Sequence, residues 1–242
     1  MDYPKIIQNL YDEKYNDAEV IFWGGSLSKG MGTDKSDLDL VIVYKNLTNA
    51  FRESYIYEGI RIETFVHNIK SIEYFFNENR DTTRSPGLIS LIKDAVEIPK
   101  GTKLSYSIKA LANEYYTKGP KPLTKDELDK LRYFITDILD DIMSPYSNHE
   151  QMASCIKLYN VLADFYFSSQ NKWTSSGKYI AKYLENENPL LATEFYESFQ
   201  LVFNKGDTNK LEILVTNLLE PYGGLIWEGF KSFAKIKAEN ER

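Results

Sequence analysis

The stretch Asp37–Tyr44, with the sequence DLDLVIVY, constrains the fold of this 242-residue chain more than any other segment. Apart from Asp39, the residues from Leu38 to Val43 are aliphatic, which is typical of a strand covered on both faces. Two neighbouring strands are expected, Ala18–Trp23, which stops at a glycine turn, and Gly59–His67, which alternates apolar with polar residues. The sequence therefore predicts a small mixed sheet with Asp37–Tyr44 at its centre.

Helical patterns replace strand patterns from Ser85 onward. Ser85-Pro86 is expected to supply an N-cap and an N1 proline for a helix over Gly87–Val96. Thr124-x-x-Glu127 is a capping box that predicts another helix start. Apolar periodicity predicts further helices over about residues 6–11, 71–76, 104–115, 128–142, 149–167, 176–185, 189–203, 207–219 and 225–237. We therefore expect an α+β fold, with a small mixed-sheet domain over residues 1–118 and an all-helical bundle domain over residues 119–242.

Composition excludes several classes of protein. The net charge is −6, whereas proteins that hold duplex nucleic acid by neutralising phosphates are usually more basic, so a nucleic-acid partner is not expected. The single cysteine, Cys155, excludes an internal disulfide and a multi-cysteine zinc site. No stretch approaches the ~18 apolar residues of a membrane span, and the first residues lack a secretory signal. We expect a cytoplasmic protein without a membrane partner, and the sequence leaves its oligomeric state open.

Two aspartates begin the central strand. Asp37 and Asp39 are two residues apart, so their side chains leave the same face with Cβ atoms roughly 6–7 Å apart. Carboxylates at that separation can converge on one hard cation such as Mg²⁺, and without a cation a charged pair beside an apolar strand is costly. Glu63, on the third expected strand, is the candidate for a third acid, with Glu58 and Glu73 as alternatives. The residues therefore predict a cation site at Asp37 and Asp39, with Glu63 as the candidate third ligand.

A glycine turn lies just before the aspartates in the sequence. Gly25 and Ser26 follow the first strand, where backbone N–H groups and a hydroxyl suit phosphate oxygens. Lys29 and Lys35 either bind phosphate or only solvate a mobile loop. Lys178 follows a small-residue turn at a helix start, as a phosphate-binding lysine does, but the two glycines of the full P-loop spacing are missing. The favoured interpretation of Lys178 is that it reaches a bound nucleotide from the helical domain.

The residues from Gly25 to Asp39 resemble the nucleotidyltransferase superfamily of the DNA polymerase β type. The pattern of that superfamily, Gly-Ser-x-x-Arg-Gly followed by Ser-Asp-hydrophobic-Asp, is similar to Gly25-Ser26-Leu-Ser-Lys29-Gly30 and Ser36-Asp37-Leu38-Asp39. Lys29 stands where arginine is common, which keeps the charge but loses the bidentate fork. The nearest overall likeness is to the kanamycin- and streptomycin-type aminoglycoside nucleotidyltransferases of antibiotic resistance, which pair this catalytic domain with a helical bundle.

The resemblance implies transfer of a nucleotidyl group, with Mg²⁺, from a nucleoside triphosphate to an acceptor hydroxyl, with release of pyrophosphate. ATP is the expected donor because the resembled enzymes commonly use it. Asp37 and Asp39 would then hold the ions, and Glu63 would bind an ion or accept the hydroxyl proton directly. Nucleotide binding would fall to a set of small and basic residues: Gly25, Ser26, Lys29, Ser36 and Lys178.

The acceptor is the part that the resemblance leaves open. A small molecule is expected, bound between the two domains against the helices of residues 124–167. Asp137 and Asp141 share one helix face, which suits a cationic, aminoglycoside-like acceptor, although a solvated helix face is the more common reason for such a pair. The alternatives are a toxin-like nucleotidyltransferase that modifies tRNA or protein, and a nucleotide-binding module without catalysis.

Overall fold

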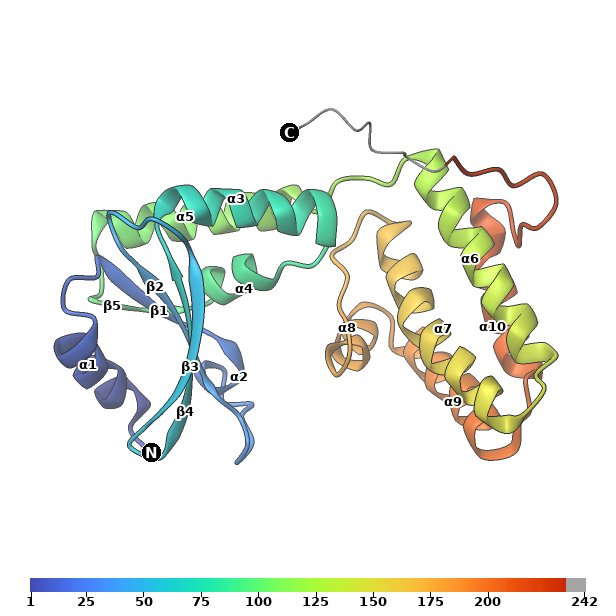
Figure 1. Ribbon diagram of the computed structural model, residues 1–242, viewed down its shortest axis with the longest axis horizontal. Helices are drawn as coiled ribbons and strands as arrows, with labels where there is room; N and C mark the ends of the chain where they lie inside the picture. Colours follow the sequence, from blue (N-terminus) through green and yellow to red (C-terminus); the bar gives the residue numbers. More distant parts are fainter. Residues whose placement is uncertain (234–242) are drawn as a thin grey trace, which may run out of the picture. The chain divides into compact units, whose positions relative to one another are not determined.

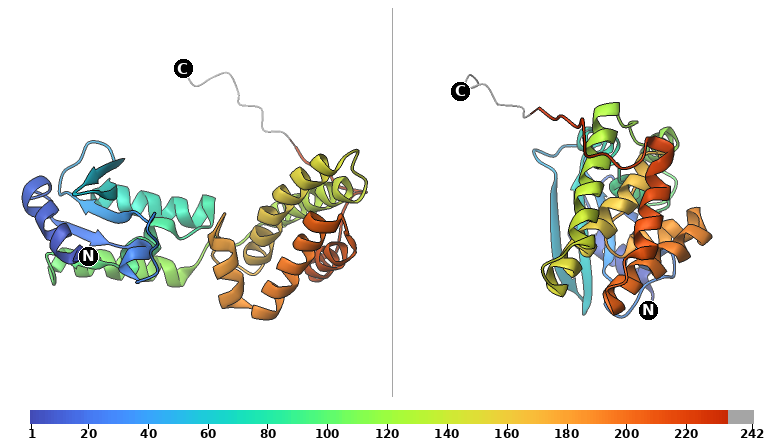
Figure 2. Two further views of the ribbon diagram at one scale, coloured as in Figure 1. Left: turned by 90° about the horizontal axis from the view of Figure 1, so that it is seen from below. Right: turned by 90° about the vertical axis from the view of Figure 1, so that its right-hand side faces the viewer.

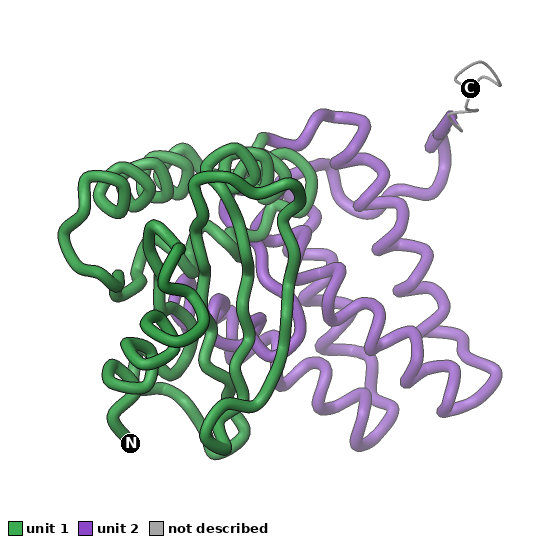
Figure 3. The backbone as a smooth tube through the Cα atoms, turned by 60° about the vertical axis from the view of Figure 1, so that its left-hand side comes forward, with its two compact units in different colours: residues 1–121 green, residues 122–242 purple. Residues whose placement is uncertain are grey.

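A computed structural model of the chain describes residues 1–233 and divides into two compact units, residues 1–121 and residues 122–242 (Figure 3). Unit 1 contains a five-stranded sheet with helices, and the described part of unit 2 is helical. The predicted fold class, a small mixed sheet followed by helices, is confirmed. Within the described residues, no helix has both the length and the apolar character needed to cross a membrane.

The sheet of unit 1 has the strand order β3-β4-β2-β1-β5 (Figure 1). Its strands are β1 (Val20–Trp23), β2 (Leu38–Val43), β3 (Phe51–Tyr57), β4 (Ile60–His67) and β5 (Val96–Ile98). Strand β2 is central and pairs antiparallel with β1 and parallel with β4. The expected centre and both of its expected neighbours are confirmed.

Helices cover the two faces of this sheet differently. The helical elements of unit 1 are α1 (Tyr3–Lys14), α2 (Gly25–Ser28), α3 (Ile69–Glu78), the π-helical turn η1 (Asn79–Thr83), α4 (Gly87–Lys93) and α5 (Lys103–Lys118). Ile7 and Leu10 of α1 share an apolar core with Leu38, Leu40 and Ile42 of β2. Because strand side chains alternate, Asp39 lies on the opposite face of β2, where α4 packs.

Strands β3 and β5 and the bounds of α4 differ from the sequence-based expectations. Helix α4 ends at Lys93, and residues 96–98 form β5, which pairs with β1 and satisfies the backbone of that strand. Pro86 is the N-cap residue rather than N1. Ser85 lies one residue before the N-cap position, and no side chain caps the helix. The Ser85 N–H donates to Thr83 Oγ1 at the end of η1, at 3.3 Å. Strand β3 was not expected at all.

Unit 2 is built around one apolar core. Its helices are α6 (Lys125–Met143), α7 (Asn148–Ser168), α8 (Tyr179–Glu187), α9 (Pro189–Lys205), α10 (Asn209–Leu219) and the short η2 (Glu220–Tyr222) (Figure 2). Side chains such as Ile138, Leu162 and Phe195 are fully or almost fully buried among these helices. The predicted capping box is confirmed, because Thr124 Oγ1 accepts from the Glu127 N–H at 3.2 Å and Glu127 Oε2 accepts from the Thr124 N–H at 2.8 Å.

The helix predicted over residues 225–237 is wrong for residues 225–233, which are not helical. Gly223 and Gly224 have φ of 103° and 72°, which ends the preceding helical turn. The buried Arg132 of α6 then holds the chain by donating to the carbonyls of both glycines, at 2.8 Å for Nε to Gly224. The Ile226 N–H donates to Thr136 Oγ1 at 3.1 Å. The last part of the predicted helix, residues 234–237, lies outside the described residues.

Candidate metal and nucleotide site

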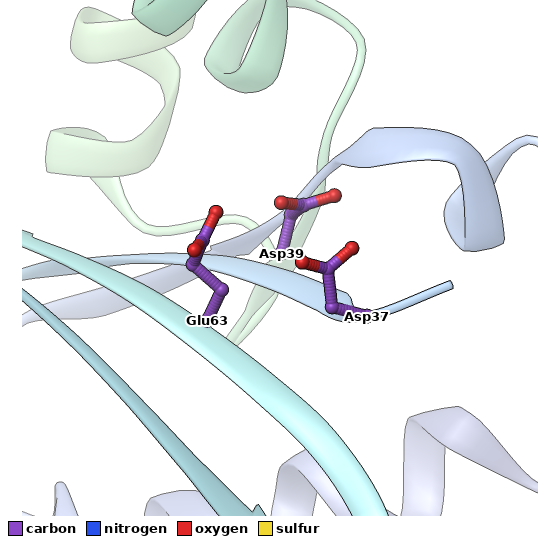
Figure 4. A group of neighbouring side chains, drawn as sticks. All are labelled: Asp37, Asp39 and Glu63. Atoms are coloured by element: carbon purple, nitrogen blue, oxygen red, sulfur yellow. The ribbon is translucent and has the colours of Figure 1, made fainter. Parts of the chain in front are cut away.

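Three carboxylates converge at the start of the central strand. The parallel register of β2 and β4 places Asp39 directly opposite Glu63, and directly opposed residues point to the same face. Asp37 comes two residues earlier, just before β2. One carboxylate oxygen of each of the three lies within 4.8 Å of the others, and Figure 4 shows the three side chains turned toward one another. All three are half-buried, so the group remains open to a ligand.

The sheet brings Glu63, and neither Glu58 nor Glu73, close to the two aspartates. Glu58 lies in the turn between β3 and β4, and Glu73 is exposed on α3, so neither joins the acidic group, which we define as Asp37, Asp39 and Glu63. Glu63 joins because the alternation of β4 turns it to the same face as Asp39. The two alternatives to Glu63 are therefore not part of this group.

The glycine turn packs directly against the acidic group. The Gly24 N–H donates to the carbonyl of Asp39 at 3.1 Å. A Cβ atom at Gly25 would lie 1.9 Å from Asp39 Oδ2, and the φ of Gly25 is +75°, so both space and backbone conformation require glycine. A Cβ atom at Gly24 would lie 2.6 Å from the carbonyl oxygen of Leu91 in α4. The turn is thus held closely between α4 and Asp39.

Strand β3 adds two donors that sequence reasoning missed. Arg52 donates to Glu63 Oε1 from Nε, at 2.9 Å, and from Nη2. Ser54 Oγ lies 3.4 Å from the same oxygen. The available signal was the short run Tyr55-Ile56-Tyr57 before Glu58-Gly59. In the structure Glu58 and Gly59 both have positive φ, as a two-residue hairpin turn requires.

The donor set of the acidic group fits a hard divalent cation. Carboxylate oxygens are the ligands that Mg²⁺ prefers, and three carboxylates this close repel one another unless a cation balances them. Arg52 balances one of the three charges. Asp37, Asp39 and Glu63 therefore fit a divalent cation such as Mg²⁺ and could hold one.

Ser26 and Ser36, predicted to bind nucleotide, lie in the segment between β1 and β2. Ser26 is half-buried in the first turn of α2, and its carbonyl accepts from the N–H groups of Lys29 and Met31, at 3.2 and 3.0 Å. Ser36 Oγ accepts from the Thr33 N–H at 2.9 Å, so this hydroxyl shapes the loop before Asp37. Nucleotide binding by these two serines stays a prediction.

Lys29 is paired with an acid outside the acidic group. Its Nζ donates to Asp94 Oδ2 at 2.9 Å, and Lys93 also contacts this carboxylate. Partial burial alone would raise the pKa of Asp94, but the two ammonium groups together hold that pKa below its ordinary value. Phosphate binding by Lys29 therefore stays a prediction that requires this ion pair to open.

The remaining predicted residues belong to unit 2. Lys178 is the exposed N-cap residue of α8, with Nζ 5.2 Å from the centre of the Tyr179 ring. On α6, Asp137 is half-buried and Asp141 is exposed. The expected contacts of Lys178 with a nucleotide and of the two aspartates with an acceptor stay predictions.

Comparison with known proteins gives little further guidance. No known protein family matches the sequence, and no curated protein matches it significantly. Among solved structures, the chain is similar to a nucleotidyltransferase-like protein from Exiguobacterium sibiricum 255-15, with 10% sequence identity and a TM-score of 0.49, over 90% of this chain and 75% of that one. A similarity this weak establishes neither a shared fold nor a shared activity.

Proposed function

We propose that the protein is a Mg²⁺-dependent nucleotidyltransferase that moves a nucleotidyl group from a nucleoside triphosphate, with ATP the expected donor, to an acceptor hydroxyl. One observation carries the proposal: the Gly25 turn packs on Asp39, whose carboxylate lies with those of Asp37 and Glu63 within 4.8 Å. A glycine turn suited to phosphates and an acidic group suited to Mg²⁺ are thereby adjacent.

The proposed reaction forms a bond between the acceptor oxygen and the α-phosphorus and breaks the bond from that phosphorus to the pyrophosphate oxygen. Pyrophosphate leaves with the electron pair of the broken bond. When bound, Mg²⁺ supplies charge stabilisation at the phosphoryl oxygens and a lower pKa for the acceptor hydroxyl. Asp37 and Asp39 hold the metal, and Glu63 either holds it as well or takes the hydroxyl proton itself.

The other residues of the proposed site bind the donor. Backbone N–H groups at Gly25 and Ser26 and the Ser26 hydroxyl orient the β- and γ-phosphates. Lys29, Ser36 and Lys178 are the further proposed contacts of the nucleotide. The half-buried position of the acidic group supports this arrangement, because the carboxylates are accessible yet partly shielded from water.

For the acceptor, we propose a cationic small molecule of the aminoglycoside kind. The net charge of residues 119–242 is −4, and Asp137 and Asp141 present two carboxylates on the same helix, which favours a polyamine-bearing ligand. A tRNA or a protein hydroxyl is the competing acceptor and is included as an outcome of the test.

The test is pyrophosphate release by the full chain with Mg²⁺ and each of the four nucleoside triphosphates. Acceptors are an aminoglycoside panel, total tRNA and a protein extract, and an α-³²P label identifies the modified product. Asp39→Asn and excess EDTA are the controls, and both should abolish release. Nucleotide binding without labelled product for any acceptor would contradict transfer and favour a binding module, and absence of nucleotide binding would contradict the proposed site itself.

A further inference from the structure

The Glu63 carboxylate has partners on strand β3 that the proposed reaction does not use. Arg52 contacts Oε1 through two N–H groups, and the Ser54 hydroxyl lies 3.4 Å from the same oxygen. Within the described residues, these donors all meet Oε1. The other oxygen, Oε2, is therefore the one left for a further ligand.

The contact between Arg52 and Glu63 differs from an ordinary surface ion pair. The side chain of Glu63 is 14% exposed, whereas that of Arg52 is 63% exposed, so a half-buried carboxylate is held by an arginine that approaches from the solvent side. The guanidinium lies 5.2 Å from the centre of the Phe65 ring, the residue that pairs with Arg52 in the sheet. Two N–H groups on one oxygen fix the rotation of the carboxylate as well as its position.

A second ion pair on β3 provides the comparison. Lys14 of α1 contacts Glu53 at 2.9 Å, and both side chains are more than two-fifths exposed, at 42% and 44%. Because side chains alternate along β3, Glu53 points to the face opposite Ser54 and Glu63. This pair also joins one cation and one carboxylate at β3, but it lies on the face away from the acidic group.

We propose that Arg52 is a positioning residue, which holds Oε1 of Glu63 so that Oε2 faces the ion shared with Asp37 and Asp39. The inference rests on the metal site of the proposed function, but it requires no turnover to be tested. Partners that orient a ligand carboxylate commonly change metal affinity by about 10- to 100-fold when they are removed.

The positive charge of Arg52 has the opposite effect on metal affinity. A guanidinium beside the site repels a cation, so an arginine that only competed with the metal would weaken its binding. Removal of Arg52 would then tighten metal binding. The sign of the change in affinity therefore separates positioning from competition.

The experiment measures Mn²⁺ binding to the full chain by electron paramagnetic resonance, without nucleotide or acceptor, and with Mg²⁺ as competitor. We expect Arg52→Gln to weaken binding by about tenfold or more, and Arg52→Lys to lie between it and the wild type, because lysine restores the charge but not the fork. Lys14→Gln is the matched control and should bind like the wild type. Circular dichroism and thermal unfolding verify that each variant folds.

Three outcomes would overturn the inference: unchanged or tighter Mn²⁺ binding in Arg52→Gln, equal weakening in Lys14→Gln, or no Mn²⁺ binding by the wild type. Should Arg52→Gln fail to fold, Arg52→Lys and Ser54→Ala decide the question by the same measurement. Failure of the proposed function gives a different result, namely Mn²⁺ binding that depends on Arg52 in a chain that releases no pyrophosphate.

Discussion

Gly25 and Asp39 are in such close contact that a Cβ atom at position 25 would lie 1.9 Å from Asp39 Oδ2 and 2.7 Å from its Cγ. No rotation of the new methyl group removes this overlap, because the Cβ position is set by the backbone. Either the carboxylate or the glycine turn would have to move. The position of one acid of the candidate metal site thus depends on the absence of a side chain at residue 25.

Gly25→Ala should therefore reduce pyrophosphate release by about 10²-fold or more, because a shift of about 1 Å at a reacting group has an effect of that size. Gly59→Ala is the matched control, since Gly59 also has a positive φ, +79° against +75°, but has nothing within 4 Å of its Cβ position. Both variants should have a free energy of unfolding about 1 kcal/mol lower than that of the wild type, because alanine is strained at positive φ. Urea denaturation measures this difference. Equal activity in the two variants would contradict a role for the Gly25–Asp39 contact.

Asp37→Asn and Asp39→Asn should each lower nucleotidyl transfer by about 10³-fold or more, because each removes charge that holds the metal. Without metal, neither change should destabilise the protein, since each relieves repulsion within the acidic group. Addition of Mg²⁺ should raise the Tm of the wild type more than that of either variant. Pyrophosphate release near the wild-type rate in Asp39→Asn would refute the assignment of the ligands.

The ion pair between Lys29 and Asp94 allows the role of Lys29 to be tested. If Lys29 binds phosphate, Lys29→Gln should raise the KM for ATP about tenfold, the effect of losing one charged hydrogen bond. Asp94→Asn releases the same lysine and should leave this KM unchanged or lower it. A rise in KM for Asp94→Asn alone would show that the pair, rather than free Lys29, supports the site.

The same pair makes a small, pH-dependent contribution to stability. Both side chains are more than a third exposed, so Asp94→Asn should lower the free energy of unfolding by less than about 1 kcal/mol at pH 7. The folded-state pKa of Asp94 is lowered, so this contribution is present above about pH 4 and is lost as the pH falls through the folded-state pKa. Urea denaturation at pH 7 and pH 3 measures the difference.

Several parts of the fold and the candidate site follow from the sequence. The aliphatic run from Leu38 to Val43 predicts a central strand, because only burial on both faces makes such a run favourable. The spacing of Asp37 and Asp39 predicts a shared face, and the alternation of β4 gives the side on which Glu63 lies. The first two inferences depend on local periodicity alone, whereas the approach of Glu63 to Asp39 also depends on the parallel pairing of β2 with β4.

Other features depend on which segments meet in space, and local patterns do not contain that information. Strand β3 has mostly exposed residues on both faces, so it lacks the apolar alternation that marks a strand, and the contact of Arg52 with Glu63 was missed with it. The segment after Gly224 has an apolar pattern but is held in a non-helical conformation by Arg132, a residue far away in the sequence. The close approach of Gly25 to Asp39 is likewise a tertiary contact.

His67 should make the stability of unit 1 sensitive to mild acid. It is buried at the end of β4, with Nδ1 at 3.1 Å from Ser71 Oγ and its ring against Phe75. Burial lowers the pKa of His67 from 6.5 to about 4, so the folded protein keeps a neutral imidazole while the unfolded chain takes up a proton. Stability present above pH 6.5 is therefore lost as the pH falls toward 4, by up to about 3 kcal/mol.

His67→Gln should reduce this loss, because glutamine can bond to Ser71 but does not titrate. The measurement is urea denaturation between pH 7 and pH 4 in a chain that carries Trp173→Phe and Trp227→Phe. The fluorescence of Trp23 reports unfolding. These background changes restrict the signal to unit 1, where Trp23 lies in β1. An identical pH dependence with and without His67 would contradict the prediction.

The last prediction concerns the charge of the acceptor. Asp137 and Asp141 are one helical turn apart on α6, half-buried and exposed respectively, so they can bind one polyamine together. If the acceptor is cationic, the double variant Asp137→Asn with Asp141→Asn should raise the acceptor KM about tenfold and leave the KM for ATP unchanged. The acceptor KM of this variant should also depend less on salt concentration than that of the wild type. Glu194→Gln with Glu212→Gln is the matched control, because both glutamates are exposed on other helices of unit 2 and the net charge changes equally. An acceptor KM that responds equally to both double variants would reflect net charge only, and one that responds to neither would favour a tRNA or protein acceptor.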